Sequence, residues 1–74
     1  MKFYVAEYSI TDGANVYVEY GVLASHTYET AIKRAGKGKR FFNRYGWVES
    51  CRLRRLQEIP EVEFEILKKY VIKM

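Results

Sequence analysis

The residues best suited to chemistry in this sequence are cations. Four of them, Lys33, Lys37, Arg40 and Arg44, fall within an arc of about 60° if residues 28–45 form one helix. A row of cations without acidic neighbours can lie along a nucleic-acid backbone, where each neutralised phosphate releases counterions. The row therefore predicts a face that binds nucleic-acid phosphates or an acidic partner. The alternative is a solvated face that only keeps the protein soluble.

Aromatic residues interleave with these cations between residues 37 and 47, in the segment KGKRFFNRYGW. Bases of single-stranded nucleic acid stack on exposed rings, so Phe41 and Trp47 are candidate stacking residues, and Lys39 is a further candidate cation. In a continuous helix Phe41 points away from the apolar stripe that contains Phe42. The alternative is that these large rings build the core of a small domain.

Two more candidate cations, Arg52 and Arg54, lie in a strand predicted over residues 47–57. They share one side of that strand and could extend the positive surface. The alternative is that they pair across the sheet with the glutamates of residues 61–65, which contributes about 0.2–1 kcal/mol per pair. Leu56 interrupts the alternation of this strand, which indicates a bulge.

Catalytic and metal-binding patterns are scarce. Cys51 is the only cysteine and His26 the only histidine, so the chain can form neither an internal disulfide nor a Cys/His zinc site. The segment GKGK at residues 36–39 lacks the spacing of a phosphate loop. We therefore expect a protein that is not an enzyme and that holds no metal and no small-molecule cofactor.

The positive charge is concentrated in the middle of the chain. The net charge is +4, yet residues 27–57 alone contain nine Lys or Arg and two Glu, a net of +7. The chain has 49% hydrophobic residues, too many for a disordered segment. No apolar run approaches the roughly 18–20 residues of a membrane span, and the first run is too short for a signal peptide. These features predict a cytoplasmic protein with no membrane partner.

The elements that must position the cations begin with a hairpin. Residues 3–10 and 16–24 alternate as two strands, and an Asp-Gly pair between them indicates a turn. The expected register sets Tyr4 opposite Val22, which places both apolar rows on one face of the sheet. These rows are Tyr4, Ala6, Tyr8 and Ile10, and Val16, Val18, Tyr20 and Val22.

A helix is predicted to follow the hairpin, over residues 28–45. Thr27 is a suitable N-cap, and the helix is expected to bend or loosen at Gly36 and Gly38, because glycine costs about 1 kcal/mol inside a helix. One apolar stripe at helical spacing is expected to be buried, and it consists of Tyr28, Ala31, Ile32 and Ala35. Ile32 is expected to pack against the sheet.

Residues 61–73 fit two patterns. Val62, Phe64 and Ile66 alternate with glutamates as in a strand, whereas Ile66, Leu67 and Tyr70 have helical spacing. The many β-branched and aromatic residues favour the strand. The expected fold is one compact α+β domain over residues 1–74, a ββαββ antiparallel sheet with one helix packed on one face. The alternative is ββαβα.

The sequence thus predicts a small binding protein whose basic helix face, about residues 33–44, engages nucleic-acid phosphates or a nucleoprotein complex. The alternative function is a protein–protein interaction module, including a homodimer formed through an open sheet edge. In length and ββαββ order the chain resembles small accessory proteins of viruses and mobile elements, some of which inhibit host protein complexes.

Overall fold

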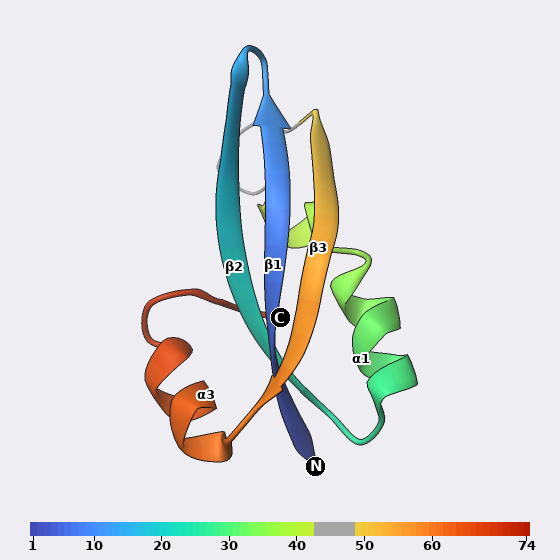
Figure 1. Cartoon of the computed structure of the whole chain (residues 1–74), viewed down its shortest axis with the longest axis vertical. Helices are drawn as coiled ribbons and strands as arrows, with labels where there is room; N and C mark the ends of the chain where they lie inside the picture. The colour runs from blue at the N-terminus through green and yellow to red at the C-terminus, as the bar shows by residue number, and fades with distance from the viewer. Residues whose placement is uncertain (43–48) are drawn as a thin grey trace.

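The computed structural model describes residues 1–42 and 49–74. Its elements are β1 (Lys2–Asp12), β2 (Asn15–Ser25), α1 (Tyr28–Ala35), α2 (Lys39–Phe42), β3 (Ser50–Ile59), α3 (Glu61–Leu67) and β4 (Ile72–Lys73). The sheet order is β3-β1-β2-β4, with β4 parallel to β2 and the other neighbours antiparallel. The α+β class is confirmed, but the expected all-antiparallel ββαββ order is not (Figure 1).

The N-terminal hairpin is present and longer than expected, but its register differs by one residue from the prediction. Asp12 pairs with Asn15, so the turn consists of Gly13 and Ala14 alone. Gly13 has a φ of 62°, which fits the first central residue of a type II′ turn. This tight turn sets Tyr4 opposite Leu23 instead of Val22.

The corrected register separates the two apolar rows. Neighbouring residues in a strand point to opposite faces, so a shift of one residue moves the whole β2 row to the other side. The first face of the sheet carries Tyr4, Ala6, Tyr8 and Ile10, all nearly fully buried. The second face carries Val22, which is buried, and Val16, Val18 and Tyr20, which are exposed.

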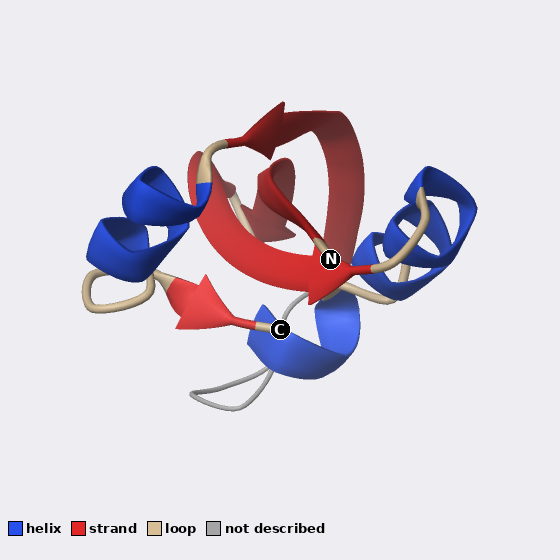
Figure 2. Ribbon diagram, turned by 90° about the horizontal axis from the view of Figure 1, so that it is seen from below, coloured by secondary structure: helices blue, strands red, loops and turns tan. Residues whose placement is uncertain are grey.

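Helices cover parts of both faces, whereas one helix on one face was expected. Figures 1 and 2 show α1 and α3 on opposite sides of the strands. On the first face, Ala31 and Ala35 of α1 join the buried tyrosines of β1 in one core cluster. On the second face, Phe64 of α3 packs against Phe3 with ring centroids 4.8 Å apart. The far end of the second face, around Val18, stays open.

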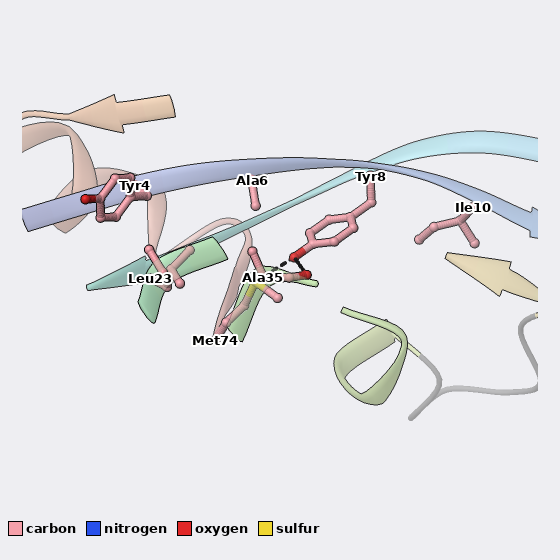
Figure 3. Packing of buried hydrophobic residues seen from close by; sticks show 8 residues of the cluster. Tyr4, Ala6, Tyr8, Ile10, Leu23, Ala35 and Met74 are labelled. Carbon is pink, nitrogen blue, oxygen red and sulfur yellow. Dashed lines mark hydrogen bonds between the residues drawn. The ribbon is translucent and has the colours of Figure 1, made fainter. Parts of the chain in front are cut away.

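Tyr8 lies at the centre of the larger core cluster, and its side chain is 1% exposed. Its hydroxyl donates to the carbonyl of Ala35 at 2.5 Å (Figure 3). Its ring also meets Phe42 edge-to-face, with 5.0 Å between the ring centroids. A Cβ at Gly38 would lie 2.8 Å from Cζ of this ring. Tyr8 therefore contacts the end of α1, the following turn and α2 together.

The expected single helix over residues 28–45 is interrupted. Helix α1 ends at Ala35, the chain turns, and α2 begins at Lys39. The interruption has a packing reason, since Gly38 must approach the Tyr8 ring more closely than any side chain would allow. Residues 43–45 of the expected helix lie outside the described residues.

The start of the helix is as predicted, and Ala31 and Ala35 of the expected apolar stripe are buried, but Tyr28 and Ile32 are exposed. Thr27 is the N-cap, and its Oγ1 accepts from the backbone N–H of Thr30 at 3.2 Å. Ile32, expected to be buried, is 40% exposed. Helix α1 instead approaches the sheet through Ala31 and Ala35, because the large tyrosines of β1 leave room only for small residues.

The strand prediction for residues 61–67 is wrong, because this segment forms α3. Pro60 precedes the helix, and Glu61 and Glu63 lie in its first turn, where the helix dipole favours acidic residues. Of the three alternating apolar residues only Phe64 is buried, while Val62 and Ile66 are exposed. The two-residue strand β4 follows, so the observed order also differs from the ββαβα alternative.

Strand β3 carries the expected bulge. Its register against β1 shifts between Glu7, which pairs with Arg55, and Tyr8, which pairs with Leu53. Arg54 is the extra residue that has no direct partner on β1. Residues 47 and 48 of the predicted strand lie outside the described residues. Among the helices described, none is both long and apolar enough to cross a lipid bilayer.

The contact between Gly38 and Tyr8 predicts the effect of adding one methyl group. Gly38→Ala should lower the free energy of unfolding by about 1–3 kcal/mol, because the buried ring must move. Gly36→Ala is the matched control, since its Cβ would meet only backbone oxygens, of Ile32 at 3.2 Å and Lys33 at 3.6 Å. Urea unfolding of both variants checks this, and an equal effect at the two glycines would contradict the packing described.

The buried hydroxyl of Tyr8 predicts a loss of stability in alkali. Burial, aided by the nearby Cys51, raises the pKa of Tyr8 well above its ordinary value of 10.0. The folded state therefore keeps a proton that the unfolded state releases. The contribution of the protonated Tyr8 hydroxyl to the free energy of unfolding is fully present below pH 10. Above pH 10 the free energy of unfolding falls by up to about 1.4 kcal/mol per pH unit.

Tyr8→Phe removes that hydroxyl and supplies the control. At neutral pH it should cost about 1–3 kcal/mol, because the Ala35 carbonyl loses its donor. The difference in unfolding free energy between the two proteins should shrink as the pH rises above 10. Parallel pH profiles would show that the Tyr8 hydroxyl ionises freely in the folded protein.

Candidate nucleic-acid interface

A basic hollow lies where α1 ends and α2 begins. It has a volume of about 400 Å³ and is lined by Arg34, Lys37, Arg40 and Phe41. Three cations and one aromatic ring thus surround a single depression. We call this site the basic hollow.

Arg34 is held in place at one wall of the hollow. From the last turn of α1, its Nη1 donates to the carbonyl of Ala24 at 2.6 Å and its Nη2 donates to that of Met74 at 2.8 Å. These two bonds fix the orientation of the guanidinium at the wall of the hollow. These two bonds also tie α1 to the end of β2 and to the residue after β4.

Sequence reasoning missed Arg34 because the expected arc assumed one straight helix. Within such a helix Arg34 lies about 100° away from Lys33 and outside the arc. The turn at residues 36–38 changes the direction of the chain and brings Arg34 beside Lys37 and Arg40. The only signal in the sequence was the adjacent Gly36 and Gly38, which indicated that the helix would not stay straight.

The structure brings together only part of the predicted site. Lys37, Arg40 and Phe41 line the hollow, whereas Lys33 is exposed on α1 and is not part of the lining. Lys39 turns away, and its Nζ donates to the carbonyl of Glu49 at 3.2 Å. The remaining predicted residues, Arg44 and Trp47, lie outside the described residues.

Phe41 contacts both the core and the basic hollow. Its side chain is half-buried and packs against the core cluster, while another part of it lines the hollow. Phe42 instead contacts the Tyr8 ring and belongs to the core side. Both phenylalanines therefore contact the core, and only Phe41 also lines the basic hollow.

The arginines of β3 do not extend the hollow. Arg52 pairs with Ser9, which places it on the second face of the sheet, opposite the face that Tyr8 and α2 share. Arg54 is exposed at the bulge. The alternative, cross-strand pairing of these arginines with the glutamates of residues 61–65, is wrong because those glutamates lie on α3.

Most cations of the chain are not neutralised by carboxylates within the part that the structure describes. The one ion pair found there joins Lys68 and Glu65 on the α3 side. Lys37 and Arg40 have no carboxylate partner among residues 1–42 and 49–74. The charges of Lys37 and Arg40 are thus available to an anionic ligand.

The cysteine and the histidine do not meet. Cys51 pairs with Ile10, whereas His26 follows Ser25, which pairs with Lys2, so the two lie about 26 Å apart along β1. Burial raises the pKa of the Cys51 thiol, and the charge of Lys39 partly offsets this effect. Residues 1–42 and 49–74 contain no cluster of three His, Cys, Asp or Glu side chains that could hold a metal ion.

The two hydrogen bonds of Arg34 predict a local stability effect. Arg34→Met should lower the free energy of unfolding by about 1–3 kcal/mol and speed amide exchange at Met74, which donates to the carbonyl of Val22. Lys33→Met removes the same charge from an exposed neighbouring position and should change stability by less than about 0.5 kcal/mol. Equal losses of stability in Arg34→Met and Lys33→Met would mean that the two hydrogen bonds of Arg34 do not stabilise the fold.

Comparison of the chain with protein-family models, with curated protein sequences and with solved structures found no match.

Proposed function

We propose that this chain is a small non-enzymatic protein that binds nucleic acid, with the basic hollow as the site that holds the phosphates. The observation that carries this proposal is the convergence of Arg34, Lys37 and Arg40 around the ring of Phe41. A cytoplasmic location, expected from the sequence, belongs to the same proposal.

The composition of the hollow favours a nucleotide unit over a bare anion. Arginine and lysine side chains bind phosphate oxygens, and arginine does so with a planar fork of donors. Phe41 adds an apolar surface on which a base can stack, which a simple anion would not use. A volume of about 400 Å³ lies near the lower end of ligand pockets, which favours one unit of a polymer held at a time.

Contacts to phosphate position a nucleic acid without reading its sequence. The described residues of the hollow offer no Asn or Gln side chain for a base edge. Lys33, exposed on the preceding helix, is available to a neighbouring phosphate. We therefore infer binding that depends little on sequence and strongly on salt.

The salt dependence of binding tests this proposal. With three cations in contact, the slope of log K against log salt should be about −2.1 on single strands and about −2.7 on duplexes. The double variant Lys37→Ala/Arg40→Ala should flatten the slope by about 1.4 on single strands, because two contacts are lost. The control Lys69→Ala/Lys73→Ala removes the same charge from exposed positions outside the hollow and should leave the slope nearly unchanged.

The role of the ring is tested separately. Phe41→Leu keeps an apolar side chain against the core but removes the stacking surface, so affinity for single strands should fall by about 1–3 kcal/mol at an unchanged salt slope. Absence of binding to DNA and RNA at about 50 mM salt would overturn the proposal. Binding to a protein that survives nuclease and is lost in Lys37→Ala/Arg40→Ala would assign the hollow to an acidic protein partner.

A further inference from the structure

The outer edge of β2 is covered over only a short length. Strand β4 pairs with Gly21 and Val22 alone. The carbonyl of Val22 accepts from the N–H of Met74, so the backbone groups of Val22 point outward, away from β1. Backbone groups alternate between the two sides of a strand, so those of Val16, Val18 and Tyr20 point outward too. Within residues 1–42 and 49–74, no strand pairs with this free edge, residues 15–20.

The two edges of the sheet have opposite chemistry. The β3 edge carries Arg52, Arg54 and Arg55 together with the bulge, devices that prevent unwanted pairing of strands. The free edge of β2 has no Lys, Arg or Pro and no bulge, and its only charged residue is Glu19. Val16 is 69% and Val18 54% exposed. An apolar, unprotected edge of this kind is suited to pairing with another strand.

We propose that a second copy of this chain occupies the free edge, with the two β2 strands antiparallel and a two-fold axis at Tyr17. In this arrangement Val16 of each copy pairs with the partner's Val18, and their outward backbone groups form the hydrogen bonds. Asn15 then faces the partner's Glu19, so an amide donor meets a carboxylate. The interface is self-complementary, as a two-fold dimer requires.

The neighbouring registers are excluded by the fold itself. An axis at Val18 would place the partner's Asn15 opposite Gly21, a position that Ile72 of β4 already occupies. An axis at Val16 would place Val18 opposite the partner's Ala14, which belongs to the hairpin turn. With the axis at Tyr17, no residue faces a partner residue of like charge. Each copy has a net charge of +4, but β2 carries no cation, so the two copies approach through strands without positive charge.

A hollow beside the free edge can receive the partner's turn. It has a volume of about 360 Å³, and its lining includes Tyr17, Glu19, Tyr20 and Tyr70. With the axis at Tyr17, the partner's Ala14 comes to lie opposite Tyr20, which brings the tight Gly13-Ala14 turn to this hollow. A Cβ at Gly13 would have no neighbour within 4 Å, so the turn projects freely.

Dimerisation has a consequence for the proposed nucleic-acid site but does not depend on it. Residues directly opposite each other in an antiparallel pair lie on the same face of a sheet. The first faces of the two copies, with α1, α2 and the basic hollows, therefore lie on one side of a continuous sheet. A dimer would present two basic hollows to one nucleic-acid molecule.

A charge exchange at the two-fold axis tests the proposal in the absence of nucleic acid. We expect the wild-type chain to sediment at about twice its 8.8 kDa mass and to protect the amides of Val16 and Val18 as its concentration rises. Tyr17→Lys and Tyr17→Glu should each be monomeric, because like charges then face each other across the axis. An equimolar mixture of the two variants should restore the dimer.

Arg55→Ala, at the opposite edge of the sheet, is the control and should leave the dimer intact. Circular dichroism of each variant verifies folding, and recovery of the dimer in the mixture excludes unfolding as the cause of dissociation. A wild-type chain that stays monomeric at every concentration would overturn the proposal. A dimer that Tyr17→Lys does not weaken would place the interface elsewhere, and binding of a foreign peptide at the Val16 and Val18 amides by a monomer would identify a different occupant.

Discussion

The packing of Tyr8 is the constraint on which the basic hollow depends. Its ring and hydroxyl contact Ala35, Gly38 and Phe42, and so hold the end of α1, the turn and α2 against the sheet. Phe42 contacts the Tyr8 ring, while the half-buried Phe41 lies between the core and the cations of the hollow. A continuous helix would have given a longer basic row but no hollow. Burial of one tyrosine therefore decides the form of the candidate site.

A second local constraint, the two-residue turn at Gly13, has the same importance for the free edge. Its positive φ permits a tight connection, and the tight connection sets the register of β1 against β2. That register moves Val16, Val18 and Tyr20 to a face that no described helix covers at that end. Since β4 is only two residues long, no strand within residues 1–42 and 49–74 pairs with the outward backbone groups of these residues.

The two constraints separate charge from apolar surface. The basic hollow contains three cations beside α1 and α2, on the first face of the sheet, and the free edge of β2 has none. Arg52 is on the second face, so the +7 excess of the middle segment does not form one patch. In the proposed dimer, such a separation would let the chain pair with a copy of itself through β2 while its cations face the proposed nucleic-acid ligand.

The sequence by itself determined the features that depend on neighbouring residues. The strand alternation of the hairpin, the Thr27 cap, the β3 bulge and the concentration of cations were all readable from it. The tertiary structure decided the features that depend on distant contacts. Ile32 stays exposed, unlike Ala31 and Ala35 of the same predicted stripe, because the tyrosines of β1 fill the space. Residues 61–67 became a helix because Phe64, Leu67 and Val71, at helical spacing, meet Phe3, Val5 and Val22 on the second face. The alternation of side chains within residues 61–67 does not predict these contacts, because the apolar surface that stabilises the helix comes from a distant part of the chain.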